Sequence, residues 1–319
     1  MKCILLNKLK ITSKKIIFKY LNFLLNILKK YLCLLIEFKD LSSSIKGHNN
    51  FILGSCFYSV IIDNMVYFYI EYNNINMIKK KYPEIACIIP KYKYLFLRKI
   101  IIQKTFLLKD INNTAELYSH AYDLLYLFRK YGKRNKISIL EMENIIKGID
   151  VIKYHYGVEM SDLLYNDLKF YMDNNEFYIG FCHGDFHGKN IMKSNNNVYI
   201  IDMDCVREKS IQEFDLIYFL NQEISVSNDI SWVNGLLYLN KYLNNDDNMK
   251  KLIYLLPNKN TINFLLFLYF FDRLGQDFSF NRDYLLFSKN EISEILMSFT
   301  ENMFLKNKIQ LSETDNTLA

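Results

Sequence analysis

The sequence predicts an α+β fold of two lobes, a small β-rich N-terminal lobe followed by a larger, mainly α-helical C-terminal lobe. Three observations support this fold class. Short β-rich runs fill residues 50–108, apolar residues recur at helical spacing after residue 112, and 50% of the 319 residues are hydrophobic, enough for a sizeable core. The predicted boundaries are 1–40 for an amphipathic helical extension, 41–111 for the N-lobe, 112–306 for the C-lobe and 307–319 for a polar tail.

Composition narrows the classes of protein. With 23% charged residues, 10 Gly and 3 Pro, the bulk of the chain is neither disordered nor collagen-like. The net charge of +6 is spread along the chain, which argues against a nucleic-acid-binding protein. Six cysteines without paired spacing indicate reduced thiols, and neither a zinc site nor a disulfide framework. The sequence contains no uninterrupted apolar run of about 18 residues, so we expect a cytoplasmic protein without a membrane-spanning helix.

Residues 14–38 form the first organised segment. Apolar residues recur in it at helical spacing, and lysines occupy much of the remainder. Two interpretations are open. The segment is either a basic helix lying on the anionic inner face of a membrane, or a helix packed on the body of the protein. The second is the commoner arrangement of an amphipathic helix, and we favour it.

The N-lobe is expected to be a small sheet with one inserted helix. Phe51–Ile62 and Met65–Glu71 are predicted as paired strands joined by a tight turn at residues 63 and 64. A polar, helical segment follows them. Tyr92–Leu97 and Ile100–Leu108 are predicted as two further strands.

The C-lobe is predicted to be mostly helical. Thr114 is a suitable N-cap for a first helix, and Gly132 is placed where that helix would end. The aromatic run Phe264–Phe271 is expected in the core, because its residues follow helical spacing. Further helices are predicted over Ile137–Ile152, Ser161–Met172, Ile211–Glu223, Ile230–Leu243 and Thr261–Leu274.

Residues 177–204 interrupt these helices and carry the chemistry. Two apolar, strand-like runs, Tyr178–Cys182 and Val198–Ile201, flank a polar loop. Strands on both sides would hold the loop rigidly, and loops held in this way often carry catalytic groups. The candidate residues are His183, Asp185, His187, Lys189 and Asn190 in the loop, and Asp202 and Asp204 after the second run.

Three of these side chains form the minimum set for phosphoryl transfer from a nucleotide. Asp185 would accept the proton of an attacking hydroxyl, and the oxygens of Asn190 and Asp202 would hold Mg²⁺. Mg²⁺ takes one or two hard oxygen ligands from protein, and phosphates and waters complete its octahedron. Positioning and charge neutralisation then supply most of the catalysis.

The motif His183-Gly184-Asp185, with Asn190 five residues later and Ile201-Asp202 after a short spacer, resembles the catalytic core of the aminoglycoside phosphotransferase and choline kinase superfamily. The resemblance implies a protein-kinase-like fold and activity. It implies that Asp185 is the catalytic base, and that His183 is a structural residue that holds the catalytic loop in place. Asn190 and Asp202 match the metal ligands, and Asp215 matches an acidic residue that supports the loop.

A second acid, Asp204, makes the segment similar to spore-coat kinase-like proteins and lipopolysaccharide-core sugar kinases. Asp204 is therefore a third candidate metal ligand, with a hydrogen bond to the following turn as the alternative. The cofactors implied are ATP or GTP and Mg²⁺. The implied acceptor is a hydroxyl of a sugar, amino sugar or amino alcohol, and an envelope glycan if residues 14–38 contact a membrane.

The N-lobe departs from the family pattern. The family places a phosphate-binding lysine on a strand where Met65–Glu71 has none, and it pairs this lysine with a glutamate of the next helix. This absence favours a rival hypothesis, a catalytically weak or inactive kinase-like protein that binds ligands or serves a structural role. Gly54, Ser55 and Lys104 are the candidate nucleotide-binding residues. The open candidates for the ion pair are Lys46, Lys79 or Lys99 for the cation, and Glu71 or Glu84 for the acid.

Several nearby residues are given ordinary roles. His187 is expected to be a solvent-exposed loop residue, because it occupies a variable position of the motif. Lys189 is either a solvated lysine or a contact of the γ-phosphate. Asp272 and Arg273 either form an ion pair or line a substrate pocket.

Overall fold

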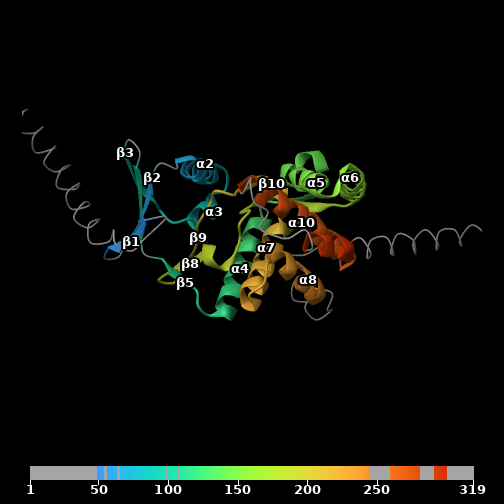
Figure 1. Cartoon of the computed structure of the whole chain (residues 1–319). Helices are drawn as coiled ribbons and strands as arrows, with labels where there is room; N and C mark the ends of the chain where they lie inside the picture. Colours follow the sequence, from blue (N-terminus) through green and yellow to red (C-terminus); the bar gives the residue numbers. More distant parts are fainter. Residues whose placement is uncertain are drawn as a thin grey trace, which may run out of the picture. The chain divides into compact units, whose positions relative to one another are not determined.

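The computed structural model describes residues 49–53, 56–62, 65–97, 100–106, 108–243, 259–280 and 291–299. Residues 14–38, the polar tail, and the candidates Gly54 and Ser55 lie outside this set. The contacts divide the described chain into two units (Figure 1). The first contains residues up to Met65 and from Tyr92 to 106, and the second contains Val66–Lys91 and everything from Leu108 onward. Residues 66–91, which we expected in the N-lobe, therefore group with the second unit.

The first unit is a four-stranded antiparallel sheet in the order β1-β2-β4-β3. The expected run Phe51–Ile62 is two strands, β1 (Asn49–Leu53) and β2 (Cys56–Ile62), which pair with each other. The strands predicted near residues 92–97 and 100–108 are confirmed as β3 (Lys93–Leu97) and β4 (Ile100–Phe106).

The strand predicted over Met65–Glu71 is wrong. This segment begins helix α2 (Met65–Lys81), which is followed by the short helix α3 (Pro83–Cys87). Phe68, Ile75 and Ile78 are buried at helical spacing. The aromatic and β-branched residues of the first two turns have strand propensity, and the tertiary burial of one helical face overrides it.

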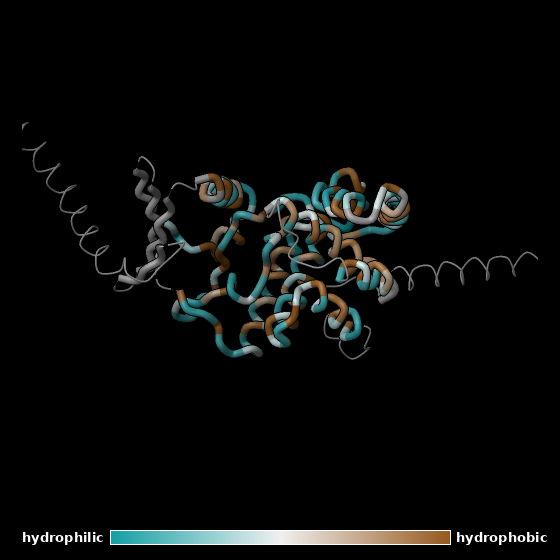
Figure 2. The backbone as a smooth tube through the Cα atoms, in the orientation of Figure 1, coloured by the Kyte–Doolittle hydropathy of each residue, from teal (hydrophilic) through white to brown (hydrophobic). Residues whose placement is uncertain are grey.

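The second unit contains the long helices (Figure 1). Figure 2 shows that these helices carry polar and apolar residues along their length, as helices that bury one face do. The predicted helices are confirmed, with shifted ends. Their bounds are α4 (Thr114–Arg129), α5 (Glu143–Tyr156), α6 (Val158–Asn174), α7 (Glu213–Asn228), α8 (Trp232–Leu243) and α10 (Lys259–Phe280), and residues 291–299 are also helical.

The first of these helices is capped one residue earlier than predicted. Asn113, and not Thr114, is its N-cap, and the Asn113 side chain accepts a hydrogen bond of 2.9 Å from the backbone N–H of Glu116. The aromatic run of α10 lies in the core as predicted, since every residue from Phe264 to Phe271 is buried.

Two small antiparallel sheets frame the loop that carries the motif. One has the order β10-β7-β6, with β6 (Lys133–Asn135), β7 (Phe177–Cys182) and β10 (Arg207–Ile211). The other has the order β5-β8-β9, with β5 (Lys109–Asp110), β8 (Ile191–Ser194) and β9 (Asn197–Ile200). The two predicted runs are thus strands β7 and β9, whereas β5, β6, β8 and β10 were not predicted. In the part of the chain that the structure describes, no helix is long and apolar enough to span a membrane.

Candidate active site

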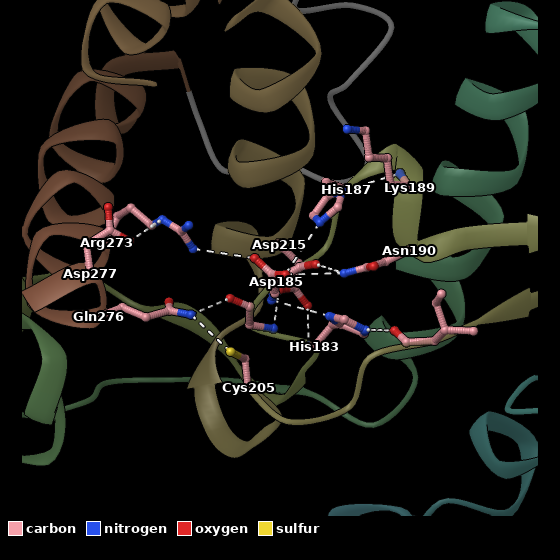
Figure 3. A network of polar contacts seen from close by, with 12 residues as sticks. His183, Asp185, His187, Lys189, Asn190, Cys205, Asp215, Arg273, Gln276 and Asp277 are labelled. Carbon is pink, nitrogen blue, oxygen red and sulfur yellow. Dashed lines mark hydrogen bonds and ion pairs between the residues drawn. The ribbon is translucent and has the colours of Figure 1, made fainter. Parts of the chain in front are cut away.

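The loop between β7 and β8 carries five of the candidate residues, His183, Asp185, His187, Lys189 and Asn190 (Figure 3). It turns sharply at Gly184, whose φ is 80°, in the left-handed region that favours glycine. A Cβ at Gly184 would also collide with the backbone carbonyl of Cys205. The loop therefore needs glycine between His183 and Asp185 for two independent reasons. Below it, Phe186 is fully buried and has edge contacts with Phe128 and His183.

His183 connects the loop to the end of strand β9. Its ring is buried, its Nδ1 accepts a hydrogen bond of 3.3 Å from the backbone N–H of Asp185, and its Nε2 lies 2.9 Å from the carbonyl oxygen of Ile201. Because Nδ1 accepts, the proton resides on Nε2, which donates to Ile201. Burial lowers the pKa of His183 to about 4, so the ring is neutral.

Asp215, at the start of α7, binds the backbone of the same loop. Its two carboxylate oxygens accept hydrogen bonds from the backbone N–H groups of His183, at 2.7 Å, and Gly184, at 2.9 Å. Burial raises the pKa of Asp215 to about 6, although the two backbone hydrogen bonds oppose this shift. The predicted loop-supporting position of Asp215 agrees with this geometry.

Asp185 is surrounded by donors. Its carboxylate lies 3.3 Å from Asn190 Nδ2, 3.4 Å from His187 Nε2 and 3.6 Å from Arg273 Nη1. Tyr218 adds a side-chain hydrogen bond. Burial alone would favour the neutral acid, but these donors and the charge of Arg273 hold the pKa of Asp185 well below its usual range. Asp185 is thus a fixed carboxylate that accepts hydrogen bonds.

The expectation for His187 is wrong. Only 17% of its side chain is exposed, and its ring faces Asp185 and lies 5.9 Å from the ring of Tyr218. His187 Nδ1 accepts from the backbone N–H of Lys189, which leaves the proton on Nε2, the atom that faces Asp185. Lys189 is exposed, in agreement with the first of its two interpretations.

Asn190 and Asp202 are brought together by the pairing of β8 with β9. The backbone N–H of Ile201 donates to the carbonyl of Asn190 at 3.0 Å, and Ile191 faces Ile200 in the register. Asn190 Nδ2 donates to the carbonyl of Asp185 at 2.9 Å, which leaves the amide oxygen of Asn190 for a ligand. Asp202 follows in the left-handed conformation, with a φ of 63°.

Negative charge gathers after this strand. Burial and the neighbouring carboxylates of Asp204 and Glu71 raise the pKa of Asp202 to about 7. Burial, together with Asp204, also raises the pKa of Glu71 to about 7. Within the described part of the chain, no ion pair neutralises Asp202 or Asp204. A site of uncompensated carboxylates beside an amide oxygen fits a hard divalent cation.

The protein supplies only part of a coordination shell. Among the described residues, no three His, Cys, Asp or Glu side chains form a metal-binding group. The candidate protein ligands are oxygens of Asn190, Asp202 and Asp204, and Mg²⁺ usually keeps waters and substrate phosphates as its remaining ligands.

Helix α2 contributes to this site. Asn74 Nδ2 donates to the carbonyl oxygens of Met203, at 2.6 Å, and Asp204, at 3.2 Å. Glu71 interacts with Asp204, whereas Glu84 pairs with Lys130 on the surface at 3.0 Å, so Glu71 is the candidate acid that lies at the site. Lys79 is exposed on α2, Lys104 lies in β4, and Lys46 and Lys99 lie outside the described residues. Sequence reasoning missed Asn74 and Tyr218, whose spacing from the motif gives no signal.

No family model matches the sequence, and no curated protein does either. Solved structures do. Choline kinase LicA from Streptococcus pneumoniae is 14% identical, with a TM-score of 0.49, over 83% of this chain and 98% of that one. A glucosamine kinase in complex with glucosamine, ADP and inorganic phosphate is 12% identical, with a TM-score of 0.38, over 84% and 83%. The aminoglycoside phosphotransferase APH(3'')-Id from Streptomyces rimosus is 12% identical, with a TM-score of 0.41, over 76% and 98%. These proteins are of the kinds that the motif resembles, and likenesses with TM-scores below 0.5 support no statement about the reaction of this chain.

Proposed function

We propose that this protein is an ATP-dependent phosphotransferase that moves the γ-phosphoryl group to a hydroxyl of a small molecule. The observation that carries the proposal is the arrangement around strands β8 and β9: Asp185 lies next to Asn190, which directly precedes β8, and Asp202 follows β9, which pairs with β8. In the described part of the chain no ion pair neutralises Asp202 or Asp204. GTP is the alternative nucleotide. The proposed acceptor class is a sugar, amino sugar or amino alcohol, with an envelope glycan as one member.

The proposed reaction forms one P–O bond and breaks another. The acceptor oxygen attacks the γ-phosphorus, the bond from that phosphorus to the β–γ bridging oxygen breaks, and the nucleoside diphosphate leaves. Asp185 accepts a hydrogen bond from the acceptor hydroxyl, orients it, and takes its proton. Mg²⁺ held by Asn190 and Asp202, with Asp204 as a further ligand, would neutralise charge on the phosphates. His183 and Asp215 fix the loop so that Asp185 points at the acceptor.

The test separates binding from transfer. Asp185→Asn is expected to lower turnover by about 100-fold or more, because an amide cannot take the proton of the acceptor hydroxyl. Its affinity for Mg²⁺·ATP should stay within about threefold of the wild type, since Asp185 does not hold the nucleotide. The measurements are transfer of radiolabelled γ-phosphate and a nucleotide titration on the same samples. Unchanged transfer in Asp185→Asn would contradict the proposal.

The rival function, a catalytically weak or inactive kinase-like protein, is favoured by one observation. Strand β2, which directly precedes α2, contains no lysine. A thermal-shift assay with Mg²⁺ and nucleotide separates the two proposals, because a ligand at 100 times its dissociation constant adds about 2.7 kcal/mol to stability. Nucleotide binding without transfer to any hydroxyl compound, or no shift with ATP or GTP, supports the rival.

Peripheral membrane contact through residues 14–38 is the alternative to the packed helix that we favour; it rests on their basic amphipathic pattern and has its own test. Removal of residues 1–38 is expected to abolish sedimentation with vesicles that contain an anionic lipid. Equal sedimentation of the full-length and shortened proteins would dismiss this contact and leave the packed helix as the remaining interpretation.

A further inference from the structure

Arg273 on α10 lies half-buried beside Asp185 (Figure 3), and its Nε has no hydrogen-bond partner among the described residues. Its Nη1 lies 3.6 Å from Asp185 Oδ1, which is beyond hydrogen-bond distance. Its Nε lies 3.1 Å from Asp277 Oδ1, but it is among the buried polar atoms that have no hydrogen-bond partner in the described part of the chain. A guanidinium carries five N–H donors and no acceptor.

The side chain is nevertheless held in place. The Arg273 guanidinium lies 4.4 Å from the centre of the Tyr218 ring, and Asp277 balances its charge. Asp277 is itself fixed by a hydrogen bond of 3.0 Å from Trp232 Nε1 on α8. With 17% of its side chain exposed, Arg273 is largely but not completely enclosed.

The neighbouring Arg207 differs from Arg273, because several side chains accept hydrogen bonds from its guanidinium. Arg207 donates to Asp272 at 2.6 Å, to Gln276 at 3.0 Å and to Ser210 at 3.5 Å. Buried donors in folded proteins normally have such partners, because an unpaired one costs about 1–3 kcal/mol. Within the described part of the chain, Arg273 has ion-pair contacts with Asp185 and Asp277 but no such set of hydrogen bonds, which leaves donor capacity for a ligand.

The position of that ligand follows from Asp185. A hydroxyl that is to lose its proton to Asp185 must come within about 2.6–3.2 Å of the carboxylate. Since Arg273 Nη1 lies 3.6 Å from the same carboxylate, the atoms next to the reacting hydroxyl fall within reach of the guanidinium. Only a hydrogen-bond acceptor can satisfy it, because arginine donates and stays charged.

We infer that Arg273 is a specificity-determining residue that binds an oxygen adjacent to the reacting hydroxyl of the acceptor. The acceptor is then a sugar, another polyol or a hydroxy acid, and not an amino alcohol, whose ammonium group would be repelled by the positive charge of the guanidinium. This inference rests on the proposed phosphotransferase function and narrows its acceptor class.

The experiment measures transfer from radiolabelled Mg²⁺·ATP to glucose, glycerate, ethanolamine and choline by the full chain. The oxygen-flanked acceptors are expected to exceed the two amino alcohols in kcat/KM by about 10- to 100-fold, the value of one charge-assisted hydrogen bond. Arg273→Gln should lower this ratio at least tenfold through KM for the acceptor, with KM for ATP unchanged. Arg273→Lys keeps the charge and loses the planar arrangement of donors, so its ratio should lie between those of the wild type and Arg273→Gln.

Two controls make the outcome decisive. Arg134→Gln is a matched substitution at an exposed arginine that pairs with Glu176, and it should leave every ratio unchanged. Arg207→Gln should lower the unfolding temperature without changing the preference among acceptors. If Arg273→Gln does not fold, the comparison of Arg273→Lys with the wild type gives the same test.

The opposing results are also distinct. A wild-type preference for ethanolamine or choline, an equal loss of all acceptors in Arg273→Gln, or transfer to none of the four by protein that binds Mg²⁺·ATP would each overturn the inference. Absence of nucleotide binding in a thermal-shift assay would instead overturn the proposed function, and the inference with it.

Discussion

Asp215 and His183, 32 residues apart in the chain, are joined by a 2.7 Å hydrogen bond from the His183 backbone N–H to the Asp215 carboxylate. The second carboxylate oxygen accepts from Gly184. A side chain of the first turn of α7 thus holds the backbone of the loop that carries the motif. The stability of the fold and the geometry of Asp185 therefore depend on the same contact.

Asp215→Asn tests this contact. An amide offers one accepting oxygen and places a donor against one of the two backbone N–H groups, so we expect a loss of about 1–3 kcal/mol in the free energy of unfolding. The measurement is urea denaturation at neutral pH. Asp229→Asn is the control, because Asp229 is exposed in the left-handed conformation, which asparagine also tolerates. Equal stability of Asp215→Asn and the wild type would show that the two hydrogen bonds contribute nothing.

The buried ring of His183 predicts a pH dependence of stability. Burial lowers its pKa to about 4 in the folded protein, against about 6.5 in the unfolded chain. As the pH falls from about 6.5 to 4, His183 binds a proton in the unfolded state but not in the folded state. The free energy of unfolding therefore falls over this window by up to about 3 kcal/mol. Above pH 6.5 this contribution is fully present.

A comparison of variants isolates this contribution. Asp215 has a pKa raised to about 6, so its own contribution to the free energy of unfolding is lost as the pH rises, the opposite direction to that of His183. Because Asp215 is present in all the proteins compared, this contribution cancels in the comparison. His183→Gln should therefore flatten the pH dependence by close to one proton, while His120→Gln, at a partly exposed histidine, should keep it. A His183→Gln curve parallel to that of the wild type would contradict the neutral, buried ring.

The carboxylates after β9 predict a separation between stability and metal binding. Asp202→Asn removes one charge from a group that includes Asp204 and Glu71. Without divalent cations we expect this variant to be as stable as the wild type or up to about 1 kcal/mol more stable, because like-charge repulsion is relieved. With Mg²⁺, its affinity for ATP should fall by about tenfold or more, since an oxygen ligand of reduced charge replaces a carboxylate.

Isothermal titration with and without Mg²⁺ measures the second effect, and thermal unfolding in a chelator measures the first. Asp162→Asn on the exposed face of α6 controls for the loss of a surface charge. A marked loss of stability in the chelator would indicate that Asp202 is a structural residue rather than a metal ligand.

The loop that carries the motif was the most predictable part of the chain. His183, Asp185, Asn190 and Asp202 lie close together in sequence and are flanked by apolar runs, so local spacing already places them at neighbouring strand ends. The start of α2 was not predictable in this way. Its first turns consist of residues typical of strands, and the burial of Phe68, Ile75 and Ile78 on one helical face decides its conformation.

The partners of Asp185 could not be predicted from the motif. Tyr218 belongs to α7 and Arg273 to α10, and only the packing of these helices brings them to the loop. His187 was misjudged for a related reason. Its ring is enclosed by residues distant in sequence, and burial of this kind leaves no periodic pattern within the loop.

The crossing of α5 and α10 supplies the last prediction. The two helices approach closely at Gly148 and Gly275, where an added Cβ would collide with the backbone of Phe271 and Asn144, respectively. A glycine-to-alanine change in an exposed helix stabilises by about 1 kcal/mol, but here the helices must separate, so we expect Gly148→Ala to destabilise by about 1–3 kcal/mol. Because α10 also carries Arg273, the same variant should weaken transfer more than nucleotide binding.

Denaturation curves measure the loss of stability in Gly148→Ala. Lys153→Ala, at an exposed position of α5, is the control. A Gly148→Ala protein more stable than the wild type would show that the helices are not in close contact there.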